Sequence, residues 1–394
     1  MSNRKQSPQF PSAFINRLKE VRVAEGLSQG ELAVRADITR QTISSIEANR
    51  YLPTTVVALQ LARVLHTSVE DLFSLQSAGE VIEARLIDVP RPASSAGPLP
   101  RVKVVKVNGR YCARPVAGLG EVLSYTVAAD GFLESQETSR RGRSDAPIVQ
   151  VRLSRDRQAI EQEIAVAGCD PAIFLAGEHL RRRKDQTSVV GWTMGSTAAL
   201  QALQRGEVHV AGLHLFDPAT GESNLPFLRR MLKGSHYEVV TFATWEEGFL
   251  VRPGNPKSIR SAADLAESSV MLVNREEGAG ARLLLDQRLR AATVDSARIR
   301  GYDTIVSSHV DVARAIAGRQ ADVGIGIRSA AQLFGLDFVP IQTARYDLVV
   351  PKSYLKSHPT LVHLFDTLVS RPFRNEIDAL GGYDTRETGT SHAL

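Results

Sequence analysis

The 394-residue sequence is poor in cysteine and in aromatic residues, with only Cys112 and Cys169 and 6% Phe, Trp and Tyr. Two cysteines are too few for a disulfide scaffold or for a zinc site made of cysteine alone, so we expect both thiols to be reduced. No run approaches the roughly 18 apolar residues of a membrane-spanning helix, and the start lacks an apolar signal core. We therefore expect a cytoplasmic protein with no membrane partner.

The sequence also lacks the common catalytic motifs: a Gly-rich phosphate loop, a metal-ligand histidine pair, a Ser-His-Asp order and a nucleophile elbow. This favours a protein that is not an enzyme. Asp170, His214, Asp303 and His309 remain as a minor catalytic alternative, to be assembled by folding. Hydrophobic content of 43%, charged content of 23% and a net charge of +5 are ordinary for a globular protein and compatible with nucleic acid.

Two short helices joined by a tight turn are predicted for Leu27–Ala33 and Thr39–Glu47. Ser28 is placed to cap the first helix, with Glu31 completing a capping box, and Thr39 can cap the second. Ile43 and Ile46 share one face of the second helix, and short polar side chains cover the other face. A plain helical bundle would not need that polar face, whereas a helix that reads a DNA major groove would.

The stretch from Phe14 to Leu75 resembles the Cro/repressor-type (XRE) helix-turn-helix family, with Asp37 where the family often has a turn glycine. The resemblance implies a DNA-binding domain at 13–76, a double-stranded DNA operator as partner, and a homodimer or higher homo-oligomer. Arg40 and Gln41 are the expected base readers. The full set of expected DNA contacts is Gln29, Thr39, Arg40, Gln41, Thr42, Ser45, Asn49 and Arg50.

Residues 1–12 are expected to be a disordered tail, and residues 80–145 a small β-rich connecting module. Within the module we predict strands at 80–88 and 122–128, a linker at 90–100, an exposed connector at 140–144 and a hairpin on Asn108-Gly109. Its basic residues either contact the DNA backbone or form a solvated strand face, and they are Arg91, Arg101, Lys103, Lys106, Arg110 and Arg114.

From residue 147 to 394, strands and helices alternate, which predicts βαβ units and a parallel sheet. We predict strands at 163–167, 188–192, 208–212, 270–273 and 321–327, and helices at 171–183, 197–205, 282–291 and 309–317. Two connections, 237–242 and 338–351, should cross to and from a second lobe at about 243–340. The prediction is a two-lobed α/β domain, so the whole chain is multidomain: an all-α head, a β-rich connector and a two-lobed domain.

Ligands of such lobes bind at the carboxyl ends of the strands, beside helix N-termini. Ser196 and Thr197 begin a helix there, which is suited to an anion without a counter-charge. In the second lobe, Gly278 and Gly280 lie in a loop flanked by Arg275 and Arg282. The alternative readings are structural: helix capping for Ser196 and Asp170, a tight turn for the glycines, and a structural role for His214.

Residues from about 165 to 351 are similar to periplasmic-binding-protein-like (type II) domains related to molybdate-binding proteins. The matching blocks include Gly168–Ala172, Ala211–Leu215 and Val273–Asp286. The resemblance implies sensing of molybdate or tungstate, with no other cofactor and no metal site. Ala281 replaces a common hydroxyl residue and a histidine before Asp170 is missing, so a small organic effector (a carboxylate or a purine) is the alternative. The expected ligand contacts are Cys169, Asp170, Gly195, Ser196, Thr197, His214, Asn274, Arg275, Gly278, Gly280, Ala281 and Arg282.

The two resemblances together imply a ligand-responsive transcriptional regulator. As a hypothesis, a small anion bridges the lobes, and their closure changes how two subunits present their recognition helices to DNA.

Overall fold

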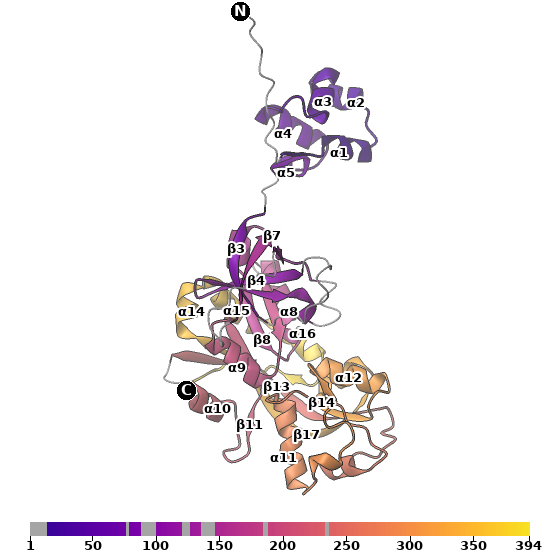
Figure 1. Cartoon of the computed structure of the whole chain (residues 1–394), viewed down its shortest axis with the longest axis vertical. Helices are drawn as coiled ribbons and strands as arrows, with labels where there is room; N and C mark the ends of the chain where they lie inside the picture. Colours follow the sequence, from indigo (N-terminus) through magenta and orange to yellow (C-terminus); the bar gives the residue numbers. More distant parts are fainter. Residues whose placement is uncertain are drawn as a thin grey trace, which may run out of the picture. The chain divides into compact units, whose positions relative to one another are not determined.

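The computed structural model describes residues 14–75, 79–87, 100–119, 127–134, 146–183, 188–232 and 236–394. The chain divides into two compact units, Met1–Glu80 and Val81–Leu394, and each is described by itself (Figure 1). The expected tail and 140–144 connector, almost all of the 90–100 linker and most of the 122–128 strand lie outside the described residues. Within the described residues, no helix is both long and apolar enough to cross a membrane.

The first unit is a helical head closed by a short strand pair. Its elements are β1 (Phe14–Asn16), α1 (Leu18–Ala24), α2 (Gln29–Arg35), α3 (Arg40–Glu47), α4 (Thr55–Val64), α5 (Val69–Leu72) and β2 (Phe73–Leu75). The predicted capping box of Ser28 with Glu31 is present, and Thr39 accepts a hydrogen bond from the backbone N–H of Thr42. Ile43 and Ile46 are buried in the core. Asp37 has φ 53°, the left-handed turn conformation that its side chain tolerates.

The second unit begins with a closed five-stranded barrel in the order β3-β5-β4-β6-β7. Its strands are β3 (Val81–Leu86), β4 (Arg101–Val107), β5 (Arg110–Pro115), β6 (Gly131–Leu133) and β7 (Ile148–Leu153). The predicted hairpin turn is confirmed, since Asn108 and Gly109 have φ 49° and 75°, as a type I′ turn requires. The expected end of this module at residue 145 is corrected, because β7 pairs with both β3 and β6 and closes the barrel.

The strand–helix alternation forms the first lobe. Its strands β8 (Ile164–Gly168), β9 (Val189–Thr193) and β10 (Val210–Leu213) pair in parallel, as predicted. Helices α8 (Ala172–Arg183) and α9 (Ser196–Gln204) connect them. The expectation of a wholly parallel sheet is corrected beyond these strands, because the remaining pairs of the sheet β16-β13-β17-β10-β8-β9 are antiparallel.

Two long strands, β13 (Tyr237–Val251) and β17 (Asp337–Pro351), run through both lobes and pair with each other (Figure 1). They replace the separate crossing segments expected at 237–242 and 338–351. The register between them shifts at Thr241/Ala243 and at Glu247/Gly248. These irregularities bend and twist paired strands, and they lie where the lobes meet.

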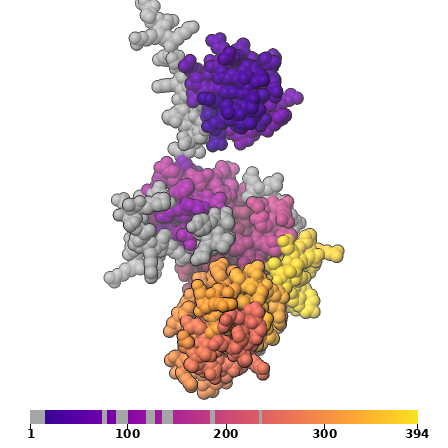
Figure 2. Space-filling view, turned by 90° about the vertical axis from the view of Figure 1, so that its right-hand side faces the viewer, coloured from indigo at the N-terminus to yellow at the C-terminus, as the bar shows by residue number. Residues whose placement is uncertain are grey.

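The second lobe packs around the far ends of β13 and β17 and appears in orange below the first lobe in Figure 2. Its main elements are η2 (Ala262–Ala266), β14 (Asn274–Arg275), α11 (Gly280–Ala291), η3 (Ser296–Arg298), β15 (Ile305–Val306), α12 (His309–Ala317), β16 (Val323–Ile327) and α13 (Arg328–Leu333). Leu272 makes an isolated bridge to Val323, so the strand predicted at 270–273 is reduced to a single bridged pair next to β14.

Smaller elements complete the chain. They are η1 (Val116–Leu119), α7 (Arg157–Glu161), β11 (Phe216–Asp217), β12 (Glu222–Ser223), α10 (Leu225–Met231), α14 (Lys352–Ser357), α15 (Pro359–Leu368), α16 (Arg371–Ala379), β18 (Tyr383–Asp384) and β19 (Ser391–His392). One apolar core joins barrel residues such as Val105 and Val107 to residues of the first lobe, so the barrel and this lobe are one packed body.

Candidate functional site

Helix α3 presents a polar surface to solvent. Arg40 and Gln41 are exposed, and Thr42 and Ser45 are half-buried. Because Ile43 and Ile46 hold the opposite side of the helix in the core, this orientation is set by the packing of the head. The surface carries the side-chain types that read base edges in a major groove.

Behind that surface lies a buried ion pair that the sequence interpretation did not anticipate. Arg22 of α1 donates to both carboxylate oxygens of Glu47 at the end of α3, at 2.6 and 3.1 Å. Gln29 donates to the same carboxylate at 2.9 Å, so this expected DNA contact also holds α2 against α3. Although burial opposes ionisation, the hydrogen bonds from Arg22 and Gln29 lower the pKa of Glu47. Asn49 is in the left-handed region, φ 53°, and its side-chain oxygen accepts from Asn16.

Three basic residues of the barrel make intramolecular contacts. Lys103 is buried against Asp130 at 2.8 Å and lies 3.6 Å from Glu163, and Lys106 pairs with Glu161 at 2.9 Å. Arg114 is buried, with its guanidinium over the ring of Trp192. For Lys103 and Arg114 both interpretations, as DNA-backbone contacts and as a solvated strand face, are therefore corrected. Arg91 lies outside the described residues.

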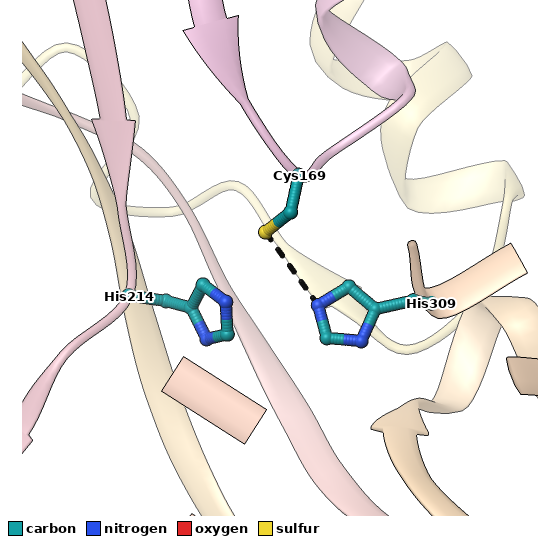
Figure 3. A group of neighbouring side chains, drawn as sticks. All are labelled: Cys169, His214 and His309. Atoms are coloured by element: carbon teal, nitrogen blue, oxygen red, sulfur yellow. Dashed lines mark hydrogen bonds between the residues drawn. The ribbon is translucent and has the colours of Figure 1, made fainter. Parts of the chain in front are cut away.

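The junction of the two lobes contains a group of buried side chains from three elements (Figure 3). Cys169 follows β8 and His214 follows β10, both in the first lobe, whereas His309 begins α12 in the second lobe. One ligand atom from each of the three lies within 4.8 Å of the others. Cys169 Sγ is 3.6 Å from His309 Nε2.

His214 is held in one orientation by contacts on three sides. Its Nδ1 is 2.7 Å from Glu247 Oε1, and its backbone N–H donates to Ser196 Oγ at 3.1 Å. A Cβ on Gly280 would lie 2.6 Å from the ring, so only glycine allows helix α11 to start this close. Burial opposes the charged ring, but the nearby Cys169 and Glu247 outweigh burial and raise the pKa of His214 to about 10.

Several buried polar atoms around this group have no hydrogen-bond partner among the described residues. They are Asp170 Oδ2, His214 Nε2, Trp245 Nε1, Arg275 Nη1, His309 Nδ1 and Tyr346 Oη. The rings are in contact, with centroid distances of 5.1 Å for His214–Trp245 and 4.8 Å for Trp245–Tyr346. Buried polar atoms in native proteins are nearly always satisfied, so this group of unpartnered atoms marks the junction as a candidate binding site, although other unpartnered atoms, such as those of Arg252 and His358, lie elsewhere in the described chain.

Asp170 combines a structural role with a place at this junction. Its Oδ1 accepts from the backbone N–H of Ala172 at the start of α8 and from the hydroxyl of Tyr383. Burial raises the pKa of Asp170 to about 6. The capping interpretation is supported for one oxygen, and the other oxygen is unpartnered.

The predicted contacts at the start of α9 connect the two lobes directly. Thr197 donates to the carbonyl of Gly278 from its backbone N–H at 3.3 Å and from its hydroxyl at 2.9 Å. Gly195 lies against Ala279 of the same loop, where a Cβ would approach to 3.1 Å. In this closed arrangement the donors of Thr197 hold the second lobe and are not available to a ligand.

Three predicted ligand contacts lie elsewhere. Arg282 interacts with Asp286, with the carbonyl of Arg275 and with the ring of Tyr302. The side chain of Asn274 bonds to backbone atoms of Tyr302 and Arg275, and Ala281 is packed in the core of the second lobe. By contrast, Arg275 is buried beside the junction, where its positive charge contributes to lowering the pKa of His309 well below its usual value, after the larger effect of burial.

Sequence reasoning did not place Trp245, Glu247 or Tyr346 at the site, and it named His309 only in the catalytic alternative. One available signal was a pair of glycines: a Cβ on Gly168 or Gly212 would come within 2.1 or 1.9 Å of the Tyr346 hydroxyl. Both glycines lie at strand ends next to predicted contacts, so a large buried side chain against them could have been suspected.

Residues 18–72 match a family model described as helix-turn-helix, and residues 177–368 match the PBP superfamily domain. The chain is 30% identical over 300 residues to the uncharacterized protein YvgK of Bacillus subtilis, covering 71% of this chain and 96% of YvgK. It is 43% identical over 63 residues to an uncharacterized HTH-type transcriptional regulator of Methanothermobacter thermautotrophicus, covering 16% of this chain and 91% of that protein.

Among solved structures, a putative phosphate ABC transporter substrate-binding protein with bound phosphate from Clostridium perfringens aligns with a TM-score of 0.43 and 10% identity. The alignment covers 58% of this chain and 99% of that structure.

Proposed function

The chain belongs to the family of helix-turn-helix regulators that carry a periplasmic-binding-protein-like domain, and we propose that it binds operator DNA in response to a small ligand held between its two lobes. The observation that carries this proposal is the set of unpartnered polar atoms at the junction. They come from both lobes and from the strands that join them, so a ligand that satisfies them stabilises the closed arrangement.

An anion is the ligand class that the free donors favour. Arg275 Nη1, Trp245 Nε1 and Tyr346 Oη are buried groups that can donate, and Arg275 carries a positive charge. An oxyanion of the molybdate or tungstate kind would accept these hydrogen bonds, as the sequence resemblance implied. The N-terminus of α9, where Gly195 provides no side-chain cap, adds the positive end of a helix dipole, which also favours an anion.

One observation favours the alternative of a small carboxylate. Arg275 is buried with Nη1 unpartnered, and arginine binds carboxylates and phosphates through paired, charge-assisted hydrogen bonds. Its Nε and Nη2 already bind Glu276, which leaves Nη1 for a ligand. A carboxylate effector would therefore replace part of an existing carboxylate contact, whereas molybdate would accept mainly from Trp245 and Tyr346.

Coupling to DNA requires that the ligand favour one arrangement of the lobes. The contact of Thr197 with Gly278 and the register shifts in β13 and β17 make the lobe junction the natural point of movement. To convert almost all molecules from one lobe arrangement to the other, a ligand must bind the favoured arrangement more tightly by about 5.5 kcal/mol. Helix-turn-helix proteins read DNA as dimers with half-sites roughly 34–36 Å apart, so a change in dimer geometry would alter operator affinity.

The test uses the fluorescence of Trp245 in the full chain. A Trp192→Phe variant leaves Trp245 as the single tryptophan. Molybdate, tungstate, phosphate and a panel of small carboxylates are titrated separately. We expect one class to change the emission with saturation, and the Arg275→Gln change to abolish a carboxylate response while leaving most of a molybdate response. No response to any of these anions would contradict the anion proposal.

A further inference from the structure

Cys169, His214 and His309 have the composition and the spacing of a transition-metal site. We propose that these three side chains bind a thiophilic metal ion of the Zn²⁺ class, and that this ion links the two lobes. Their ligand atoms lie within 4.8 Å of one another, and all three side chains are buried. Thiolate sulfur and imidazole nitrogen are both ligands that Zn²⁺ takes, and three protein ligands leave a fourth position open to water or to an effector.

The contacts of His214 are those of a metal ligand. When Nδ1 donates its proton to Glu247 Oε1 at 2.7 Å, the lone pair of Nε2 is left free, and that atom is buried without a partner. A carboxylate behind a histidine is the usual support of a metal-bound imidazole, because it sets the tautomer and the ring orientation. Glu247 is itself held by Gln342 at 3.0 Å, so the support is part of a longer chain of hydrogen bonds.

The charges near the three ligands also suit a divalent cation. The thiolate of Cys169 and the carboxylates of Asp170 and Glu247 would carry three negative charges at the junction, whereas the positive charge of Arg275 is already paired with Glu276. A divalent ion would offset two of these three negative charges. Such compensation lowers the penalty for leaving a charge buried without a partner. Binding needs Cys169 as a thiolate and His214 with an unprotonated Nε2, so the thiol proton and any proton on Nε2 are released to solvent.

The position of the ligands gives the ion a structural consequence. Cys169 and His214 belong to the first lobe and His309 begins α12 of the second lobe, as Figure 3 shows. An ion held by all three can form its full set of bonds only when the lobes are closed. The metal would therefore favour closure independently of the anion, and the site does not depend on the identity of the effector proposed above.

Cobalt is the direct probe, because a bound thiolate gives Co²⁺ an intense near-ultraviolet charge-transfer absorption. The full chain is stripped with a chelator and titrated with Co²⁺, then with Zn²⁺. We expect the absorption to appear at one equivalent and to disappear when Zn²⁺ displaces Co²⁺. Cys112→Ser is the matched control, since Cys112 is equally buried but packs in the core shared by the barrel and the first lobe, with its thiol 3.8 Å from the Gly206 carbonyl. It should behave as the unmodified chain does.

Cys169→Ser should lose the charge-transfer band, and His309→Gln should weaken Co²⁺ binding at least tenfold while the chain remains folded by circular dichroism. Chelator-reversible thermal stabilisation of the unmodified chain by Zn²⁺ gives a second readout that needs no variant. An absent band, or an equal band in Cys169→Ser, would overturn the metal site. Because the anion titration follows Trp245 emission and the metal titration follows the cobalt band, failure of either proposal leaves the other separately measurable.

Discussion

The head and the lobe junction differ in whether their buried polar atoms have hydrogen-bond partners. In the head, the buried Arg22 and Glu47 satisfy each other, and Gln29 adds a third hydrogen bond. At the junction, His214, Trp245 and other buried side chains keep atoms without partners. The difference teaches that the buried polar groups of the head serve its packing, whereas those of the junction are the ones on which the proposed ligand binding rests.

The largest expected effect is on the head. Replacing Arg22 by Ala leaves the Glu47 carboxylate buried without its partner, which costs about 3–5 kcal/mol in comparable cases. Hydrogen exchange of residues 18–72 should become close to that of an unfolded segment. The double change Arg22→Met/Glu47→Leu removes both charges and should restore most of the protection. If Arg22→Ala leaves the hydrogen exchange of residues 18–72 unchanged, the stability of the head does not depend on this ion pair.

The next effect concerns the packing of Tyr346 at the junction. Gly212→Ala places a Cβ 1.9 Å from the Tyr346 hydroxyl, so the ring must move. Overpacking of this kind costs about 1–3 kcal/mol. We expect that loss in denaturant unfolding followed by tryptophan fluorescence, because Trp192 and Trp245 both lie in the second unit.

The control for this change is to repeat it in a Tyr346→Leu background, which removes the ring whose Oη, Cζ and Cε1 would lie 1.9, 2.4 and 2.9 Å from the added Cβ. In that background Gly212→Ala should cost much less stability than in the unmodified chain. An equal cost in both backgrounds would show that the clash is not the cause.

A pH effect is expected where the barrel joins the first lobe. His209 Nδ1 accepts from the backbone N–H of Ala165, and His209 Nε2 lies 3.1 Å from the Lys106 carbonyl, so the neutral ring fits both contacts. Burial, and to a smaller extent His358, lowers the pKa of His209 to about 3. Its stabilisation is complete above the unfolded pKa near 6.5 and is lost as the pH falls towards 3.

Between pH 7 and pH 5 this histidine should therefore remove about 2 kcal/mol of stability from the second unit, at roughly 1.4 kcal/mol per unit below pH 6.5. In the His209→Gln variant, the same pH change should lower the free energy of unfolding by about 2 kcal/mol less than it does in the unmodified chain. Unfolding free energies measured at both pH values for the two chains check this difference. Equal losses in both chains would assign the pH dependence to other groups.

The smallest effect on stability is expected at the DNA-reading surface. Arg40→Ala and Gln41→Ala change exposed side chains and should alter the stability of the head by less than about 0.5 kcal/mol. Each should nevertheless weaken recognition of a selected operator by about 1–3 kcal/mol. Fluorescence anisotropy with operator and random DNA measures this loss, and an unchanged operator affinity would place base reading elsewhere.

Local features of the fold could be predicted from the sequence because neighbouring residues determine them. The Ser28–Glu31 capping box, the Asn108-Gly109 turn and helix α12 at 309–317 are of this kind. The 15-residue strands could not be recognised, because β13 and β17 continue through polar stretches that are stabilised by pairing with each other and with strands distant in sequence.

The candidate site was predicted only in part, because local sequence features locate some of its residues and folding brings in the others. Strand exits located Cys169 and His214, but His309 joins them from a distant segment through the folding of the second lobe. Arg282 and Asn274 looked equally suitable in the sequence, and local partners direct their side chains away from the junction.

The central claim is that occupancy of the lobe junction changes DNA binding, and operator affinity of the full chain measured with and without ligand tests it most directly. A labelled operator, selected from random DNA with this protein, is titrated with metal-free protein alone, with Zn²⁺ and with the anion that changes Trp245 emission. We predict that the apparent Kd changes at least tenfold with one of them and that Cys169→Ser loses the Zn²⁺ response. An unchanged Kd, under conditions where the junction is demonstrably occupied, would contradict the account.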